Sequence, residues 1–311
     1  MSTTTAPAPL HVAVTGATGL VGSALTAALA ARGHDVVALT RQTGRAGAGG
    51  VRYVTCDPRS AASVGAAIEG ADAVVNLAGH NLFDGRWTEA RRALIRSSRV
   101  DATRALVEAI GAAPRKPSVL VSASAVGIYG MLPPERTVDE SAPPAEDFLA
   151  EVCRAWETEA VAAERHGVRT VLARLGVVLS RDGGAVKEMA LPFKLFVGGP
   201  VGRGRQVVSW VHLDDVVGML TAMVEDARWR GPVNVVAPAP VSNRDFARAM
   251  GRAMHRPAFL PTPPLALRVV LGPVASLVTA GQRVLPTVAS RLGYAFRFSD
   301  VGAAMAHLFR P

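Results

Sequence analysis

The 311-residue chain has little cysteine, lysine or tyrosine, and no uninterrupted apolar run long enough to span a membrane. Its two cysteines, Cys56 and Cys153, exclude a disulfide framework and a cysteine-rich metal site and indicate a reducing, cytoplasmic location. The histidines are isolated and lack paired ligand spacing, so no metal is expected. The most apolar stretch, residues 263–281, is broken by Arg268 and by prolines and glycines. We therefore expect a pair of buried helices there and no membrane association.

The formal net charge is +9, and nearly all of the positive charge comes from arginine. The three lysines are Lys116, Lys187 and Lys194. The arginines are scattered, and no basic run is interleaved with aromatic residues, so a nucleic-acid partner is not expected. The excess charge instead favours an anionic cofactor and a small anionic substrate.

Short apolar runs alternate along the chain with longer helical patterns. The runs are nearly continuous in Val, Leu and Ala, which is typical of strands buried on both faces of a parallel sheet. The alternation predicts the α/β class, with a doubly wound parallel Rossmann sheet. The expected strands are 11–16, 35–41, 51–55, 73–79, 118–124 and 169–176, and the expected helices are 20–32, 59–69, 87–111 and 147–166.

After about residue 180 the pattern loosens. We expect residues 1–180 to form an NAD(P)-binding Rossmann domain and residues 181–311 a smaller, mixed C-terminal domain that binds substrate. A helix and strand near 207–238 are expected to return to the first domain. Ser242 or Asn243 is expected to cap one helix of the second domain, and Asp214 or Asp215 another.

The stretch "VTGATGLVGSALTAAL", residues 14–29, places three glycines three residues apart between a predicted strand and a predicted helix. This is the context that a dinucleotide-binding loop requires. Gly16 allows the tight turn, Gly19 lets the backbone approach a pyrophosphate, and Gly22 lets helix and strand pack closely. The N–H groups at the helix start then face the phosphates.

The end of the second predicted strand indicates which dinucleotide is bound. An NAD site has an acid there for the ribose 2′-hydroxyl, whereas a basic residue suits the 2′-phosphate of NADP. The sequence "VVALTRQTGR" has no acid, and Arg41 stands at the strand end with Arg45 behind it. NADP(H) is therefore the favoured cofactor, although Arg41 as an ordinary solvated loop residue is the alternative.

Several stretches, in order along nearly the whole chain, carry a family resemblance. They are "TGATGLVG", "NLAGHNLFDGRWTEARRALIRSSRVDATRALV", "SASAVGIYG", "FLAEVCRAWETEA", "VVSWVHLDDVV" and "LPTVASRLGYAFRFSDVGAAMAHL". The chain resembles the extended and atypical short-chain dehydrogenase/reductases. Within that group it is similar to epimerase-family proteins of unknown substrate with a C-terminal domain of unknown function.

The resemblance implies an NADP-binding fold with substrate between the two domains. It places Asp57 near the adenine, and Leu77, Ala78 and Gly79 under the cofactor. The residues assigned to cofactor binding are Gly16, Thr18, Gly19, Leu20, Val21, Gly22, Arg41, Asp57, Leu77, Ala78, Gly79, Arg174, Gly176 and Val177, the last three on the nicotinamide side.

Ordinary members of that superfamily reduce carbonyls with a Tyr-x-x-x-Lys pair and an upstream serine. This chain has no such pair, because Asp57, Pro133 and Phe298 stand four residues after its three tyrosines. Alignment on "FLAEVCRAWETEA" puts Leu149 at the tyrosine position and Cys153 at the lysine position. Leucine cannot exchange a proton, and a helical cysteine without a nearby cation is usually an inert small hydrophobe.

Four residues remain as catalytic candidates. Ser124, with Ser122 as fallback, stands where the superfamily serine stands, and Tyr129 offers a phenol. Arg99 falls on one predicted helix face with Arg92 and Arg96. The resemblance implies that Arg99 stands where ordinary extended members have a polar residue beside the active-site serine and tyrosine, and a guanidinium there would bind an anion or polarise a carbonyl. His212 offers proton exchange near neutral pH. The alternative for each is a structural role.

These observations favour an NADP(H)-dependent oxidoreductase of ketoreductase or epimerase type, acting on a small anionic or sugar-like carbonyl substrate without the usual tyrosine and lysine. The alternative is a protein that senses NADP(H), or acts as a scaffold, without turnover. A homodimer through helices 87–111 and 147–166 is left open, because no decisive apolar stripe marks it.

Overall fold

The computed structural model describes residues 8–47, 49–263, 265, 267, 269 and 272–310. In these ranges no helix is both long enough and apolar enough to cross a membrane.

Seven parallel strands form the central sheet, in the order β3-β2-β1-β4-β5-β7-β11. The doubly wound parallel sheet predicted from the sequence is therefore confirmed. Val14 of the first strand pairs with Ala38 on one side and with Val75 on the other. The strands are β1 (His11–Thr15), β2 (Asp35–Thr40), β3 (Val51–Thr55), β4 (Ala73–Asn76), β5 (Val119–Ala125), β7 (Arg169–Leu175) and β11 (Gly231–Val235).

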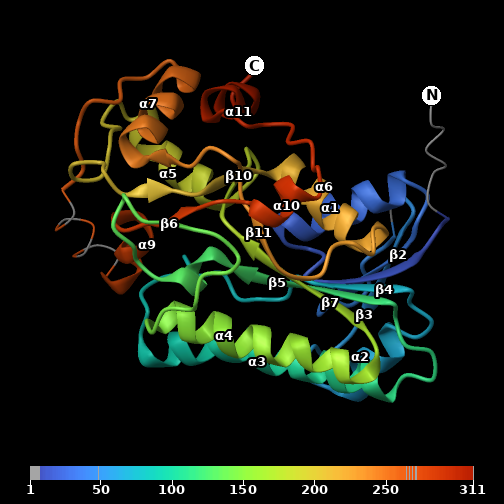
Figure 1. The fold of residues 1–311 in the computed structure, drawn as a ribbon. Helices are drawn as coiled ribbons and strands as arrows, with labels where there is room; N and C mark the ends of the chain where they lie inside the picture. Colours follow the sequence, from blue (N-terminus) through green and yellow to red (C-terminus); the bar gives the residue numbers. More distant parts are fainter. Residues whose placement is uncertain are drawn as a thin grey trace.

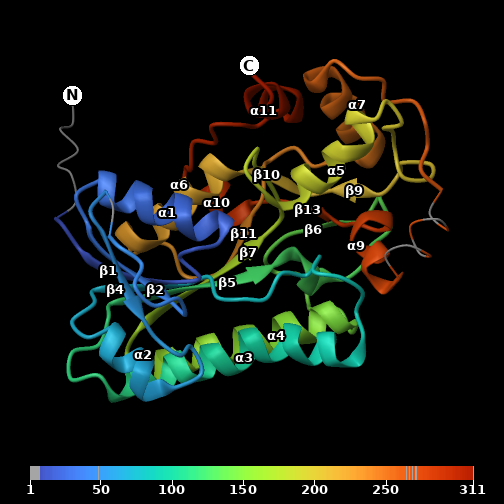
Figure 2. The ribbon, with the colours of Figure 1, turned by 180° about the vertical axis from the view of Figure 1, so that it is seen from behind.

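Helices cover both faces of this sheet, as Figures 1 and 2 show from opposite sides. One layer holds α2 (Ala61–Ala67), α3 (Glu89–Ala112) and α4 (Phe148–Val161), the last followed by the 3₁₀ turn η2 (Ala162–His166). The other layer holds α1 (Leu20–Ala31), α6 (Leu213–Glu225) and α10 (Thr287–Arg291).

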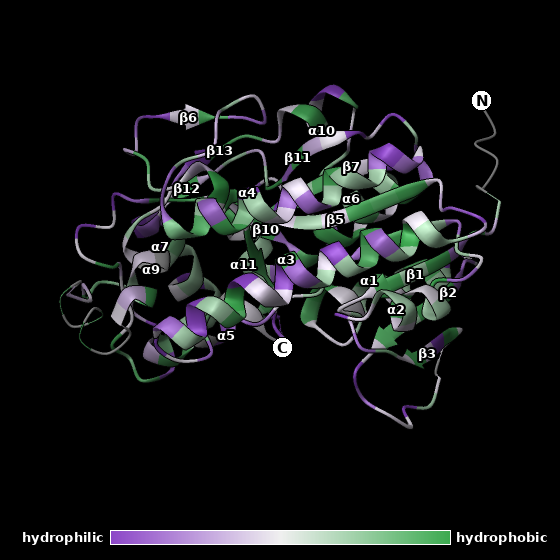
Figure 3. Cartoon of the chain, turned by 90° about the horizontal axis from the view of Figure 1, so that it is seen from below, coloured by the Kyte–Doolittle hydropathy of each residue, from purple (hydrophilic) through white to green (hydrophobic). Residues whose placement is uncertain are grey.

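The two layers follow from the two-residue period of the strands. Val12 and Val14 pack toward α1 and α6, whereas Ala13 between them packs toward α3 and α4. Seen from the α3–α4 side in Figure 3, polar and apolar residues alternate along these two helices in front of largely apolar strands. Each helix therefore buries one stripe against the sheet and leaves the other to solvent.

The remaining elements form a second body beside the sheet. Its core joins Trp210, Phe246, Met250 and Met305. Its elements are β6 (Thr137–Val138), β8 (Val177–Leu179), β9 (Val207–Val208), β10 (Trp210–His212), β12 (Val241–Ser242), β13 (Arg283–Val284), α5 (Gly184–Lys194), α7 (Asn243–Met254), η3 (Gly272–Ala275), α9 (Ser276–Thr279) and α11 (Val301–Leu308).

The prediction of buried helices at 263–281 is only partly right for the described part of that segment. Val274 and Ala275, in the 3₁₀ turn η3, are buried, whereas two other apolar residues are not. Leu265 and Val269 are 72% and 67% exposed. Residues 264, 266, 268, 270 and 271 lie outside the described residues. The apolar composition of this stretch alone does not distinguish its buried residues from its exposed ones.

Helix α6 and strand β11 return to the large sheet, in the region 207–238. Strand β11 pairs with β7 along its length. Glu225, at the end of α6, accepts hydrogen bonds from Arg32 Nε at 2.7 Å, and its Oε1 lies 2.9 Å from His34 Nε2. This contact ties the end of α6 to the end of α1 and to the start of β2.

Asp215 on α6 holds the segment that leads into α11. Its carboxylate is buried and accepts the backbone N–H groups of Arg297 at 2.7 Å and Phe298 at 2.9 Å. Burial raises the pKa of Asp215, and these hydrogen bonds oppose that rise. The carboxylate thus supplies hydrogen-bond acceptors for two backbone N–H groups that would otherwise lack a partner.

We expect Asp215→Ala to destabilise the protein by about 2–4 kcal/mol, because it leaves buried N–H groups without an acceptor. Urea unfolding measures the loss. The control is Asp214→Ala, whose half-exposed carboxylate pairs with the exposed Arg297 and is expected to cost under about 1 kcal/mol. Equal costs for the two variants would contradict this account of how the C-terminal segment is held.

Candidate cofactor and substrate site

The strand order reverses direction between β1 and β4. From β1 the chain runs outward to β2 and β3, then crosses to β4, β5 and β7 on the other side. The loops after β1 and β4 therefore part and leave a crevice at the carboxyl edge of the sheet, where ligands bind in open α/β folds. Asn76, at the end of β4, accepts from Thr15 Oγ1 at 2.7 Å and donates to Thr103 Oγ1 at 2.8 Å. These buried bonds hold both loop origins in place.

The glycine loop lies in this crevice and has no room for side chains at two positions. Gly16 has φ 65°, and a Cβ there would lie 2.5 Å from the Leu77 carbonyl oxygen. A Cβ on Gly22 would lie 2.3 Å from the Gly16 carbonyl oxygen. Gly19 and Thr18 are exposed. The turn is therefore closed on its inner side and open on its outer side.

The start of α1 has no side-chain cap. Its cap residue is Gly19, and no acidic residue stands in its first turn. In contrast, α3, α4, α7 and α11 are capped by the side chains of Thr88, Asp147, Ser242 and Asp300. Because the donors at the start of α1 have no such partner, they suit an external anion such as a pyrophosphate.

Two arginines lie beyond β2, on the β2 side of the crevice. Arg41 follows the strand directly and is exposed, and Arg45 lies over the Tyr53 ring at 4.6 Å. Asp57, after β3, is also exposed and accepts a hydrogen bond from the backbone of Arg59 at 3.0 Å. In the described residues no carboxylate forms an ion pair with Arg41 or Arg45, so both arginines can receive a phosphate.

Ser124 lies in a buried charged network and does not present a free hydroxyl. Its Oγ donates to Glu157 Oε1 at 2.6 Å. Glu157 is held by Arg174 through two bonds of 2.8 Å, from Nε and Nη2. Burial alone would lower the pKa of Arg174, but the hydrogen bonds and charge of Glu157 raise it above its ordinary value. Arg174 therefore stays a cation, and the Ser124 hydrogen is directed toward Glu157.

Tyr129 belongs to the same network. Its hydroxyl accepts from Arg174 Nη1 at 2.8 Å and donates to Asn234 Oδ1 at 2.8 Å. Burial raises the pKa of Tyr129 despite the nearby guanidinium. The phenol is 2% exposed and stays neutral at neutral pH.

The structure therefore brings Ser124, Tyr129 and Arg174 together, through a partner, Glu157, that the sequence analysis did not select. Arg174 was assigned to the nicotinamide side of the cofactor, yet its guanidinium faces Glu157 and Tyr129. A sequence signal for Glu157 does exist. Glu157 stands four residues after Cys153 and eight after Leu149. It therefore shares a helix face with the two residues that stand at the usual tyrosine and lysine positions.

Cys153 and Arg99 adjoin this network. Burial raises the pKa of the Cys153 thiol to about 12, although the Arg99 charge works against that rise. The thiol is therefore neutral at pH 7. Arg99 donates to the carbonyls of Ile95 at 3.1 Å and His80 at 3.0 Å. A Cβ on Gly79 would lie 3.1 Å from the Arg99 guanidinium, which places this arginine against the loop after β4.

His212 lies apart from this cluster, at the start of α6. Its Nδ1 accepts the Asp214 N–H at 3.1 Å, so His212 itself is the N-cap. The prediction that Asp214 or Asp215 caps this helix is therefore wrong. The helix begins earlier than expected, so both aspartates lie in its first turn and the His212 imidazole accepts the free N–H. Burial lowers the pKa of His212 to about 4, with Asp214 opposing the shift and His307 and Arg297 adding to it. It is a poor proton donor at neutral pH.

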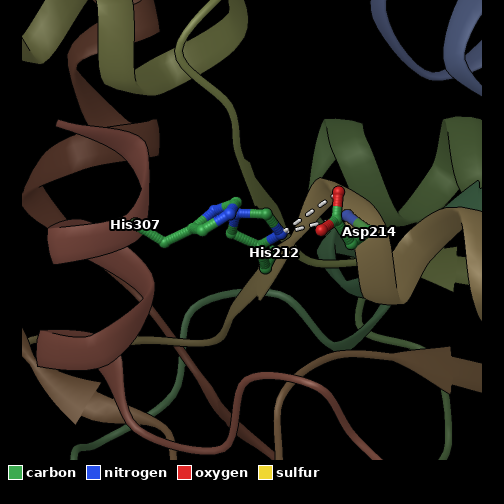
Figure 4. Close-up of side chains that lie close together, drawn as sticks. All are labelled: His212, Asp214 and His307. Carbon is green, nitrogen blue, oxygen red and sulfur yellow. Dashed lines mark hydrogen bonds and ion pairs between the residues drawn. The ribbon is translucent and has the colours of Figure 1, made fainter. Parts of the chain in front are cut away.

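Figure 4 shows the His212 ring between His307 and Asp214. These three residues are close enough to suggest a metal site. The tautomer argues against one. Because Nδ1 of His212 accepts the cap hydrogen bond, neutral His212 carries its proton on Nε2, which lies 3.3 Å from His307 Nδ1. That nitrogen is then a donor to His307 and has no lone pair for a metal.

Gly176 and Val177 connect the sheet to the second body. A Cβ on Gly176 would lie 2.4 Å from the Ser209 carbonyl oxygen, and Val177 pairs with Trp210. Close packing of β7 against β10 thus requires the glycine. Their assignment to the cofactor remains a prediction.

A cavity of about 610 Å³ opens where the second body meets the loop after β5. Its lining includes Met131, Val201, Gln206 and Thr279, and the only charged side chain among its described lining residues is Arg203. Its size suits a small molecule, and its charge favours an anion.

The family model "NAD dependent epimerase/dehydratase family" matches residues 12–236, and a "Domain of unknown function (DUF1731)" matches residues 262–308. The chain belongs to the NAD dependent epimerase/dehydratase family. The resemblance found in the sequence is thereby confirmed, including its C-terminal domain.

The relatives span the whole chain. The epimerase family protein YfhF of Bacillus subtilis is 40% identical over 299 residues, covering 96% of this chain and 98% of that protein. The crystal structure of human epimerase family protein SDR39U1 (isoform 2) with NADPH is 35% identical, with a TM-score of 0.86 and coverage of 96% and 99%. A nucleoside-diphosphate sugar epimerase from Corynebacterium glutamicum is 36% identical with a TM-score of 0.78, covering 97% of this chain and 58% of that one.

We expect Glu157→Gln to destabilise the protein by about 3–5 kcal/mol, because it leaves the buried Arg174 guanidinium without a carboxylate. Thermal and urea unfolding measure this. Glu159→Gln is the matched control on the same helix, since Glu159 pairs with Arg104 at the surface, and it is expected to cost under about 1 kcal/mol. A Glu157→Gln protein as stable as Glu159→Gln would show that the pair contributes nothing to the fold.

Stability at acidic pH tests the environment of His212. Its folded pKa lies below the ordinary value, so the unfolded state binds the proton first as pH falls below about 6.5, and stability declines toward pH 4. His212→Asn retains a good cap and cannot titrate. Between pH 7.5 and 5 we expect wild type to lose about 1–2 kcal/mol more than His212→Asn in urea unfolding. Parallel losses in the two proteins would mean that His212 is not buried as described.

Proposed function

We propose that this protein is an NADP(H)-dependent oxidoreductase of ketoreductase or epimerase type that acts on a small anionic or sugar-like carbonyl substrate. The observation that carries the proposal is the glycine loop at the switch point. It is closed against Leu77 on its inner side, open outward, and followed by an uncapped helix start. The NADPH bound in the human relative supports the same cofactor here.

The choice of NADP(H) over NAD(H) rests on Arg41 and Arg45. Both lie just beyond β2 with no carboxylate paired to them in the described ranges, and they would hold the 2′-phosphate. Leu20, Val21, Leu77, Ala78 and Asp57 would line the cofactor, as the family resemblance implies.

Bound NADP(H) would supply or accept the hydride. The chain's own residues would bind, orient and exclude water. The cavity beside the loop after β5 is the proposed substrate site, with Arg203 attracting an anionic group. Ser124 would present its oxygen as an acceptor, because its hydrogen is engaged by Glu157. It would therefore favour a substrate hydroxyl over a carbonyl as its partner.

The proton that accompanies the hydride needs a source other than Tyr129 or His212. Tyr129 donates to Asn234, and His212 is neutral and bonded on both nitrogens. We propose that water or the substrate's own hydroxyl exchanges this proton. An epimerase would return the hydride to the same substrate and leave the cofactor unconsumed, whereas a ketoreductase would consume it stoichiometrically.

A second candidate function, NADP(H) sensing without turnover, is favoured by the same network. The hydroxyls of Ser124 and Tyr129 both donate to groups of the protein, which suits a structural role. Cofactor binding with no change in nicotinamide absorbance and no exchange of substrate configuration, across hydroxy acids, keto acids and nucleotide sugars, would favour sensing.

Fluorescence titration with NADPH and NADH tests the cofactor proposal. We expect wild type to bind NADPH more tightly than NADH, and Arg41→Ala to weaken NADPH binding by about tenfold or more while leaving NADH little changed. Arg52→Ala, an exposed arginine within β3, is the control. Failure of wild type to bind either nucleotide would overturn both candidate functions.

A further inference from the structure

Arg99 is a largely buried cation without a carboxylate partner. Its guanidinium donates only to two backbone carbonyls, those of Ile95 and His80, and lies 5.4 Å from the centre of the Trp156 ring. Among the described residues no acid forms an ion pair with it. The contrast is Arg174, which has Glu157 in a two-bond pair.

Such a guanidinium retains unused donors. It carries five N–H groups, and the carbonyls of Ile95 and His80 engage two. Burial lowers the pKa of Arg99, which reflects lost hydration without a compensating charge. An oxygen-rich anionic ligand would supply both the acceptors and the charge that the protein leaves out.

The position of Arg99 points to the crevice. Its guanidinium lies against Gly79, two residues after Leu77, whose carbonyl closes the glycine loop at Gly16. Gly79 is itself exposed. Arg99 therefore lies on the β4 side of the switch point, opposite Arg41 on the β2 side.

A dinucleotide centred on the glycine loop has two halves on these two sides. If the adenine half lies over β2 toward Arg41, the other half extends over β4 and β5, past Gly79 toward Ser124. Two other arginines near this side are already engaged: Arg174 pairs with Glu157, and Arg91 contacts the His80 imidazole. The nearby Cys153 is a neutral thiol and supplies no charge. Lys187 and Lys194 lie on α5, in the second body.

We propose that Arg99 is the positioning residue for the nicotinamide half of the bound cofactor, donating from α3 to its ribose and phosphate oxygens. This inference rests on the proposed function. Cys153 on α4 stands at the lysine position of the family resemblance and carries no charge. Arg99 on α3 would supply the cation on this side of the site instead. Arg99 would then hold the nicotinamide near the carboxyl end of β5.

Comparison of a whole and a partial ligand tests the proposal. Adenosine 2′,5′-bisphosphate contains the adenine half of NADPH and lacks the nicotinamide half. We expect Arg99→Met to weaken NADPH binding by about tenfold or more, with the affinity for the bisphosphate within about twofold of wild type. Arg41→Ala should weaken both ligands. Arg96→Met, an exposed arginine on the same helix, is the matched control and should change neither.

Three outcomes decide the matter. NADPH affinity of Arg99→Met within about twofold of wild type, or equal losses for both ligands, would overturn the inference while leaving the proposed function intact. Wild-type protein that does not bind NADPH would overturn the proposed function itself. If Arg99→Met does not fold, Arg99→Lys decides by the same ratio: a loss confined to NADPH supports the inference, and an equal loss overturns it.

Discussion

The two-bond pair between Arg174 and Glu157 is the interaction on which the rest of the site depends. It joins β7 to α4 inside the protein, where both side chains are buried. Through Glu157 it orients Ser124 on β5, and through Arg174 it orients Tyr129 and Asn234 on β11. The pair thus links the last three strands of the sheet at their carboxyl ends.

Asn234 and Glu140 connect this hydrogen-bond network to the C-terminal segment. The side-chain amide of Asn234 donates to the Leu285 carbonyl at 2.9 Å, and Glu140 Oε1 accepts the backbone N–H groups of Asn234 and Val288. The second body is therefore attached to the sheet by polar groups that begin at the charged pair.

The same network engages the hydroxyls of Ser124 and Tyr129, so neither is held as a free acid–base group. A tyrosine that exchanges protons at neutral pH needs its pKa lowered by a nearby free cation. Arg174 lies beside Tyr129, but Glu157 neutralises it and burial dominates. The hydroxyls of Ser124 and Tyr129 are engaged within the protein, and Arg99, on another helix, is a largely buried cation that forms no ion pair in the described part of the chain.

Much of the fold could be predicted from the sequence. The continuous apolar strands and the glycine loop depend on local composition and spacing, so their positions agree with the structure to within a few residues, as with β3 at Val51–Thr55. The role of Glu157 depends on a partner 17 residues away on another element, which one sequence does not reveal. The cap at His212 could not be predicted because aspartate is the more common cap.

The exposure of Leu265 and Val269 shows the same limit. Hydropathy identifies these residues as apolar, but their burial depends on which other elements cover them. The family resemblance implies that Arg99 lies beside the site. Only the structure shows that, among the described residues, no carboxylate pairs with Arg99. That missing partner is the reason to expect an anionic ligand there.

Tyr129, with its raised pKa and its two hydrogen bonds, is a neutral phenol with a structural role. Ultraviolet difference absorbance near 295 nm, recorded from about pH 6 to pH 9 with and without NADPH, measures tyrosine ionisation directly, because an ordinary tyrosine titrates near pH 10. We expect the titration curves of wild type and Tyr129→Phe to be the same over this pH range, because Tyr129 does not ionise in it. A tyrosine that ionises near pH 7 in wild type and is absent from Tyr129→Phe would contradict it, and would restore Tyr129 as the acid–base group.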